Sequence, residues 1–424
     1  MTTRTRYLLT ERDGSRIELT EEDVQFLESR DEFTIHRLAS GAVEVTSVRH
    51  VGVIGLPGED LLEIEPKAPC NLLHYLAYVD RLDEELVTGT EASIRVGESF
   101  VDLIAKLFLS EVDGVLKRGL KQEYLTQESE ERYLKGQLEL QNQLQRHGPA
   151  GTRFECRYDE LSREVVENKL LLDAVGRLRQ LVDDGDLLSK LNRYYGRLNQ
   201  QVTHETMSLS DFEEVTINRL HEYYENPLEL AELIFQQEYV ESLRGLDRQF
   251  SSLLINMENT FENVVAKAVD SVVDSSRYDV RTASYGALLR DSGGESVLNL
   301  QPDFYIWDQQ TRQVVLVGDA KWKIHTEPKR EDLYQVAAYQ AKYGIPGVLV
   351  YPDLDNRIAE SLVYDEEKGT AAGRGDLSVI ELQTGDTESY EEFKRTVEST
   401  VEDFIRKCGL KEGMIDLDRK RNGI

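Results

Sequence analysis

Residues 301–321, with the sequence QPDFYIWDQQTRQVVLVGDAK, decide the fold of the C-terminal part of the chain. Two apolar runs rich in β-forming residues, 304–307 and 314–318, flank a polar break at 308–313. Runs of this kind on either side of a short polar segment predict a β-hairpin. We therefore expect a hairpin whose turn lies near residue 310.

Three charged residues stand at the ends of this predicted hairpin. With the turn near residue 310, Asp303 pairs close to Gly318 and Asp319 in the strand ladder. Asp319 and Lys321 are two residues apart on one strand, so their side chains project from the same face. Two carboxylates and one ammonium group should therefore converge where the strands end. This arrangement suits a divalent metal ion and a phosphate group.

These residue types match the needs of phosphodiester hydrolysis. The reaction requires an activated water, neutralised charge on the phosphate and support for the leaving oxygen, and a divalent metal ion supplies all three. Carboxylates are natural ligands of Mg²⁺, for which Mn²⁺ is the expected substitute. We expect Glu262, on a helix predicted over 257–273, to join Asp303 and Asp319 as a metal ligand. Lys321 is expected to hold the attacking water or to stabilise the charged transition state.

A glutamine and a tyrosine follow on a helix predicted over residues 330–343. Gln335 and Tyr339 are four residues apart and share a face of that helix, from which they could hold a DNA phosphate or orient Lys321. Alternatively, Tyr339 packs in the core and Gln335 is its exposed neighbour. Each part of the pattern is common alone, because Pro-Asp is usually a turn and Asp-X-Lys is usually a surface ion pair. The whole ordered set rarely arises by chance.

The length of 424 residues predicts two or three domains. We expect an α+β multidomain protein with a β-rich, partner-binding module at residues 1–95 and a mainly helical middle region at 96–250. A C-terminal α/β domain with a central mixed sheet is expected at 251–424, because helices and strands alternate there. The alternative for residues 1–95 is a small β-barrel or sandwich with a structural role only.

Hydrophobic periodicity and turn residues place the individual elements. In the N-terminal segment the expected strands are 33–38, 42–46, 50–56 and 61–65, with a helix from residue 71. In the middle region the expected helices are 100–116, 164–183, 187–198 and 213–224, and extended segments are expected at 135–138 and 153–158. In the last segment the expected elements are strands at 282–289, 297–307, 346–351 and 377–382 and a terminal helix at 389–408.

Basic residues gather in the middle region of an otherwise acidic chain. They form either a solvated helical face or a surface that contacts the DNA backbone. The six residues are Arg132, Lys135, Arg146, Arg153, Arg157 and Arg163.

The net charge of −29 is the most unusual feature of the composition. Taken alone it argues against a nucleic-acid partner, because duplex binding rests on neutralising phosphates. The excess of acid, with 17 lysines against 33 arginines, is typical of a halophile protein kept soluble in a salt-rich cytoplasm. Salt at that strength screens charges beyond a few ångströms, so local basic residues then matter more than the total charge.

Other compositional features indicate the compartment. No apolar run approaches the ~20 residues of a membrane span, and the first residues lack the apolar core of a signal peptide. The three cysteines, at 70, 156 and 408, are far apart. They argue against a disulfide framework and against a four-cysteine zinc or iron–sulfur site. We expect a cytoplasmic protein that does not bind membranes.

The ordered motifs resemble the PD-(D/E)xK nuclease superfamily, in the RecB-like branch with a trailing Gln-X-X-X-Tyr motif. Within it, residues 257–262, 302–303, 319–323 and 332–339 are similar to the McrC family, the nuclease subunits of McrBC 5-methylcytosine restriction systems. The likeness extends upstream and so covers most of the chain. The upstream segments are Ile64-Glu65-Pro66-Lys67, Leu134-Lys135-Gly136-Gln137 and Glu167-Asn168-Lys169-Leu170-Leu171.

The resemblance implies a PD-(D/E)xK, restriction-endonuclease-like domain at 251–424 that cuts DNA only with a partner. That partner is an McrB-like AAA+ GTPase hexamer, which recognises the modified cytosine in double-stranded DNA. The N-terminal part of an McrC-like chain engages the ring and stimulates its GTPase. This chain has no Gly-X-X-X-X-Gly-Lys phosphate loop, so GTP is expected to bind the partner and not this chain.

Two alternative functions stay open. A stand-alone RecB-like repair or defence nuclease would cut DNA without GTP or a partner. A largely non-catalytic adapter would stimulate an AAA+ motor while its nuclease site was weak or vestigial. The complete set of acidic and basic residues argues against the adapter, because a retired site is expected to lose at least one of them.

Overall fold

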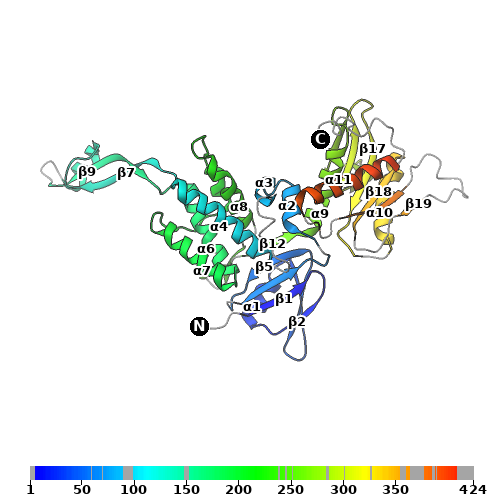
Figure 1. Cartoon of the computed structure of the whole chain (residues 1–424), viewed down its shortest axis with the longest axis horizontal. Coiled ribbons are helices and arrows are strands. Elements are labelled where there is room, and N and C mark those ends of the chain that lie inside the picture. The colour runs from blue at the N-terminus through cyan, green and yellow to red at the C-terminus, as the bar shows by residue number, and fades with distance from the viewer. Residues whose placement is uncertain are drawn as a thin grey trace, which may run out of the picture. The chain divides into compact units, whose positions relative to one another are not determined.

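In the computed structural model the chain forms two compact units, and Figure 1 labels many of their elements. The first unit joins Met1–Ile94 to Leu254–Ile424, and the second comprises Arg95–Leu253. The three-domain division at 1–95, 96–250 and 251–424 stays a prediction, but its first and last segments share one unit. The structure describes residues 5–407 except 59, 69, 89–98, 148–151, 237–238, 244–245, 251, 283–285, 300, 325–326, 354–359, 363–376, 384–386 and 388.

The N-terminal segment of the first unit contains two small sheets. Their strands are β1 (Arg6–Thr10), β2 (Ser15–Ile17), β3 (Phe33–Arg37), β4 (Val43–Ser47), β5 (His50–Gly55), β6 (Leu61–Glu65) and β12 (Ser252–Asn256). One sheet has the order β1-β6-β5-β12, with β1 parallel to β6, and the other has the antiparallel order β2-β4-β3. The four strands predicted in this segment are confirmed as β3 to β6.

Three helices accompany these sheets: α1 (Glu21–Glu28), α2 (Leu72–Tyr78) and α3 (Glu84–Thr88). The helix predicted from residue 71 is confirmed as α2. Asn71 is its N-cap and its side chain accepts a hydrogen bond from the backbone of Leu73, which satisfies one of the free N–H groups at the helix start.

The last segment of the chain is built on a six-stranded mixed sheet. In spatial order its strands are β13 (Tyr278–Arg281), β16 (Phe304–Asp308), β17 (Gln313–Ala320), β18 (Gly347–Pro352), β20 (Leu377–Leu382) and β19 (Glu360–Leu362). β16 and β17 form the predicted antiparallel hairpin, with Phe304 opposite Gly318. β17, β18 and β20 run parallel to one another, so their carboxyl ends meet at one edge.

The single strand predicted over 297–307 is wrong. Its two parts are β15 (Ser296–Asn299), which forms a separate hairpin with β14 (Ala287–Arg290), and β16 in the main sheet. Pro302 lies between them, and proline interrupts a strand because it has no N–H to donate to the ladder.

Three helices pack in this segment: α9 (Met257–Val272), α10 (Arg330–Tyr343) and α11 (Tyr390–Lys407). All three were predicted. α10 packs on β17 and β18, where Val336 joins a buried cluster with Leu349 and Tyr351. α10 ends at Gly344, whose φ of 66° is left-handed and favours glycine.

The second unit contains more strands than predicted beside its helices. Its helices are α4 (Phe100–Arg118), α5 (Leu140–Arg146), α6 (Val166–Leu181), α7 (Gly185–Asn199) and α8 (Glu225–Phe235). Its strands are β7 (Glu123–Glu131), β8 (Gln137–Leu138), β9 (Phe154–Ser162), β10 (Tyr239–Leu243) and β11 (Leu246–Phe250). β7, β9 and β8 form an antiparallel ribbon that extends away from α4, α6 and α7 in Figure 1. β7 carries few apolar residues, so hydrophobic periodicity does not reveal it.

The helix predicted over 213–224 is also wrong. This segment holds only two short 3-10 turns, Leu209–Glu214 and Glu222–Tyr224. Between them the backbone N–H of Thr216 donates to Glu167 on α6 over 2.9 Å, so a tertiary contact replaces the helical hydrogen bond.

No helix in the described part of the chain is long and apolar enough to cross a membrane.

Candidate active site

Three of the predicted catalytic residues meet at the end of the β16–β17 hairpin. Because Phe304 pairs with Gly318, the preceding Asp303 lies beside Asp319. The Nζ atom of Lys321 is 2.5 Å from Oδ2 of Asp319 and 3.7 Å from Oδ2 of Asp303. One ammonium group therefore lies against both carboxylates.

Backbone hydrogen bonds fix the strand end that positions the lysine. The N–H of Ala320 donates to Oδ2 of Asp303 over 2.7 Å. The N–H of Lys321 donates to the carbonyl of Val350 on β18 over 2.8 Å. Asp303 thus has two roles here, because its carboxylate lies near Lys321 and also accepts the hydrogen bond from Ala320.

Burial strengthens the electrostatic interactions of this cluster. The side chain of Asp319 is fully buried, and only 17% of the Lys321 side chain is exposed. Burial, and then repulsion from Asp303, raises the pKa of Asp319 to about 7, and burial also raises the pKa of Asp303. Burial acts to lower the pKa of Lys321, but attraction to Asp319 and Asp303 outweighs it and leaves that pKa above its usual range. The lysine therefore stays charged.

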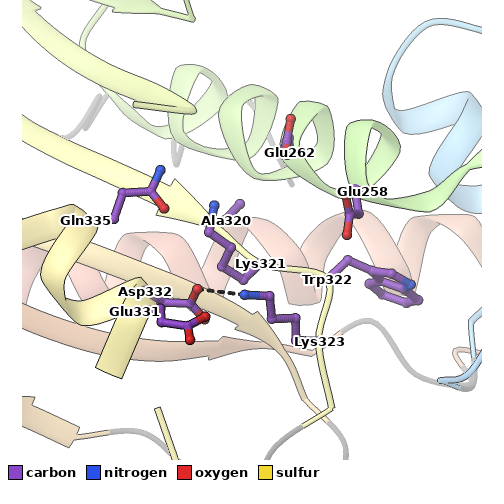
Figure 2. Close-up of a pocket in the computed structure, with 9 residues that line it drawn as sticks. All are labelled: Glu258, Glu262, Ala320, Lys321, Trp322, Lys323, Glu331, Asp332 and Gln335. Atoms are coloured by element: carbon purple, nitrogen blue, oxygen red, sulfur yellow. Dashed lines mark hydrogen bonds and ion pairs between the residues drawn. The ribbon is translucent and has the colours of Figure 1, made fainter. Parts of the chain in front are cut away.

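The third predicted carboxylate comes from α9. This helix begins at Asn256, whose side chain accepts a hydrogen bond from the backbone of Asn259. One turn later, the half-buried Glu262 lines a pocket of about 340 Å³ together with Lys321. Burial, and then repulsion from Asp303, raises the pKa of Glu262 to about 7. In Figure 2, α9 and α10 contribute acidic side chains on two sides of the strand end that holds Lys321.

Gln335 and Tyr339 form a hydrogen-bonded pair that contacts Asp319. The Nε2 atom of Gln335 donates to Oδ1 of Asp319 over 3.2 Å and to the hydroxyl of Tyr339 over 2.7 Å. The Tyr339 hydroxyl donates in turn to the carbonyl of Gln301 over 3.0 Å. Tyr339 is 4% exposed, so its place is in the core, whereas Gln335 also lines the pocket. The pair contacts Asp319, and no hydrogen bond from it to Lys321 is seen among the described residues.

Sequence reasoning missed several residues that line the same pocket. Asp332 on α10 accepts hydrogen bonds from Lys323 over 2.6 Å and from the hydroxyl of Tyr351 over 2.9 Å. Glu258 is four residues before Glu262 and therefore lies on the same face of α9. Both residues lie in segments that resemble the McrC family, 257–262 and 332–339, but neither was given a role from the sequence.

The three predicted carboxylates suit a hard divalent ion such as Mg²⁺, which prefers carboxylate oxygens, although only Glu262 of the three lines the pocket. Glu262, Asp303 and Asp319 would hold it. Burial, and then repulsion from Asp303, raises the pKa values of Glu262 and Asp319, and a bound cation would relieve that repulsion.

Another set of acidic and histidine side chains lies in the second unit. In the part of the chain that the structure describes, it is the one group whose potential ligand atoms all lie within 4.8 Å of one another: Glu130, His147 and Glu155. Arg153 pairs with Glu130 and Arg146 pairs with Glu155. These two members of the predicted basic group therefore already neutralise the carboxylates.

The fold and pocket define a mixed α/β protein with clustered carboxylates and one lysine at the end of a central hairpin. Residues 45–352 match the family model described as McrBC 5-methylcytosine restriction system component. The chain belongs to this family, which confirms the resemblance seen in the sequence.

Two structures that match this chain come from Thermococcus gammatolerans. One is described as the refined half-complex from a tetradecameric assembly of McrB AAA+ hexamers with bound McrC. It has a TM-score of 0.63 and 17% identity, covering 93% of this chain and 100% of that chain. A second, described as the McrBC complex, has a TM-score of 0.44 and 17% identity, covering 67% of this chain and 90% of that chain. No curated protein matches the sequence.

Proposed function

We propose that this chain is the DNA endonuclease subunit of a GTP-dependent restriction complex that acts on DNA containing 5-methylcytosine. Its C-terminal segment would be a PD-(D/E)xK nuclease that hydrolyses phosphodiesters with Mg²⁺. Its partner would be an McrB-like AAA+ GTPase hexamer, which binds GTP and which this chain stimulates.

The observation that supports this proposal most is the contact of Lys321 with Asp319 and Asp303 at the end of a central hairpin. Glu262, on α9, lines a pocket together with Lys321 and interacts electrostatically with Asp303, so all three carboxylates lie near the same lysine. Family membership supports the restriction system as the setting. In the Thermococcus structure, McrC is bound to McrB AAA+ hexamers, and we extend that assembly to this chain.

Each residue has a distinct role in the proposed reaction. When bound by Glu262, Asp303 and Asp319, a divalent ion supplies a polarised water and neutralises phosphate charge. Lys321 holds the water or stabilises charge that develops on the phosphate oxygens. Gln335 orients Asp319 through its hydrogen bond, and Tyr339 holds Gln335 in place.

The proposal is tested by reconstituting cleavage with the purified chain, its cognate motor, GTP, Mg²⁺ and methylated DNA. Wild-type protein should cut, and Asp319→Asn should not. Arg37→Ala is the matched control, because Arg37 forms exposed ion pairs with Glu21 and Glu28 away from the pocket. Cutting by Asp319→Asn at the wild-type rate would overturn the site.

Two control reactions distinguish the alternative functions. Cleavage without motor or GTP would indicate a stand-alone nuclease. Stimulated GTP hydrolysis without cleavage, in either Mg²⁺ or Mn²⁺, would indicate an adapter.

A further inference from the structure

Glu11, a buried carboxylate of the N-terminal segment, contacts Trp322, which lies just after β17. Glu11, 1% exposed, directly follows β1. Its Oε2 atom accepts a hydrogen bond from the indole Nε1 of Trp322 over 2.8 Å. Its Oε1 atom accepts from Nζ of Lys67 over 3.0 Å. Trp322 is itself buried and is the residue immediately after Lys321.

Lys67 completes this contact from a second side. It comes from the Glu65-Pro66-Lys67 segment after β6, and its ammonium lies 5.5 Å from the centre of the Trp322 ring. The contact is therefore a cation–π interaction as well as an ion pair with Glu11. A buried ion pair of this kind contributes little to stability compared with apolar packing, but it fixes geometry when both partners are satisfied. Lys67 belongs to the Ile64-Glu65-Pro66-Lys67 segment noted in the sequence, and it lies outside the pocket but contacts both Glu11 and Trp322.

The next residue, Arg12, contacts Glu258, which lines the pocket from α9. Arg12 has a left-handed φ of 63°, a conformation that costs energy for a residue other than glycine and must be held by its surroundings. Its guanidinium donates to the carbonyl of Val48 over 3.1 Å and pairs with Glu258 on α9. Arg49 pairs with the other oxygen of Glu258 at 3.4 Å. Glu258 is one helical turn before Glu262.

We propose that Glu11 and Arg12 are positioning residues of the nuclease centre. Glu11 fixes the backbone that carries Lys321 by holding the Trp322 indole, and Arg12 fixes the turn of α9 that carries Glu262. One turn of the N-terminal segment thus sets the separation of the catalytic lysine and a metal ligand. A partner that moves the end of β1 would change that separation. This inference rests on the proposed nuclease function.

The test of Glu11 compares Glu11→Ala, Glu11→Gln and Trp322→Phe in the full chain with its motor. Glu11→Ala and Trp322→Phe should lower the maximal cleavage rate by about 100-fold, as expected for an ångström-scale misplacement, with unchanged KM for DNA. Glu11→Gln should recover most of the rate, because its amide oxygen still accepts the indole hydrogen bond. Glu32→Ala is the matched control, since Glu32 pairs with the buried Arg30 in the same segment.

A spectroscopic readout makes the result independent of cleavage. In a Trp307→Phe background, Trp322 is the sole tryptophan, and its emission should shift to longer wavelength in Glu11→Ala and stay near the parent in Glu11→Gln. Failure of the parent chain to cut would refute the proposed function. A cutting parent together with wild-type rate and unshifted emission in Glu11→Ala would refute the positioning role alone. Should Glu11→Ala not fold, the rate of Trp322→Phe decides in the same way.

Arg12 is tested by Arg12→Ala against Arg37→Ala, which removes an exposed arginine from the same segment. Arg12→Ala should raise the Mg²⁺ concentration needed for half-maximal cleavage by about 10-fold, the lower end of the loss seen when a residue that supports a metal ligand is removed. The apparent Kd for Mg²⁺ from thermal shift should change in parallel. An unchanged Mg²⁺ requirement in a folded Arg12→Ala protein would refute its role.

Discussion

The ammonium of Lys321 lies 2.5 Å from the fully buried carboxylate of Asp319, although the two residues are separated by a single alanine. The chain therefore holds the proposed catalytic cation and anion together in the absence of substrate. From this contact we derive separate predictions for catalysis, metal binding and stability.

Asp319→Asn should abolish cleavage while leaving the protein at least as stable as the wild type at pH 8. At that pH the wild-type carboxylate is ionised although burial disfavours the charge, and asparagine removes that cost while its amide oxygen still accepts from Gln335. The melting temperature by circular dichroism and the cleavage rate check both parts. A melting temperature well below that of the wild type would mean that the ion pair with Lys321 stabilises the fold.

Lys321→Met should separate metal binding from catalysis. Loss of the ammonium removes the positive charge that competes with a divalent ion at Asp303 and Asp319, so the apparent Kd for Mg²⁺ should fall. The cleavage rate should nevertheless drop by about 10²–10³-fold, the usual effect of removing one electrostatic group from a reaction centre. Isothermal titration with Mg²⁺ and single-turnover cleavage test the two halves. Weaker Mg²⁺ binding in this variant would contradict the assignment.

Stabilisation by Mg²⁺ should increase between pH 6 and pH 8. The pKa values of Glu262 and Asp319 are raised to about 7 in the folded chain, so without metal their contribution to stability is present at low pH and is lost as pH rises through 7. Mg²⁺ binds the ionised forms and restores that loss. Thermal melts with and without Mg²⁺ at matched ionic strength check this. An equal or larger shift at pH 6 would argue against carboxylate ligands.

Tyr339→Phe should lower the cleavage rate without changing the salt dependence of DNA binding. The substitution removes the hydroxyl that accepts from Gln335 and donates to the carbonyl of the exposed Gln301, and loss of such a hydrogen bond costs ~0.5–1.5 kcal/mol. A residue that contacts phosphate would instead reduce the salt slope of binding. Binding isotherms at several salt concentrations distinguish these outcomes, and a reduced slope would contradict the supporting role.

Gly318→Ala should destabilise the hairpin that holds the site. A Cβ atom at this position would overlap the ring of Phe304 across the β16–β17 pair, and overpacking of a core typically costs ~1–3 kcal/mol. Gly114→Ala is the control, because a Cβ there meets nothing within 4 Å in the middle of α4. That variant should gain roughly 0.5–1 kcal/mol from helix propensity. Urea denaturation of both variants checks the difference, and equal stability would contradict the predicted clash.

The parts that were predictable from sequence depend on local signals. The hairpin follows from two apolar runs around a polar turn, and the helix over 330–343 follows from apolar periodicity and a glycine at its end. Asp303, Asp319 and Lys321 could be placed together because strand pairing and alternation determine which residues face one another.

The parts that were missed depend on contacts distant in sequence. The indole of Trp322 meets Glu11 across 311 positions, and no periodicity encodes such a pair. β7 was missed because its polar residues carry no apolar alternation, and the helix expected over 213–224 was lost to the hydrogen bond between Thr216 and Glu167. In the segment 213–224, a tertiary interaction overrides the local helix propensity.

The pairing of β12 with β5 has a consequence for the order in which the protein is made. The edge of the N-terminal sheet is completed by a strand that begins at Ser252, after the whole second unit has been synthesised. At ~5–20 residues per second, the ribosome needs on the order of ten to forty seconds between β6 and β12. During that interval β5 has an open edge in the nascent chain. Glu11 also has no indole to bind until Trp322 emerges, so the proposed nuclease centre can form only late in synthesis.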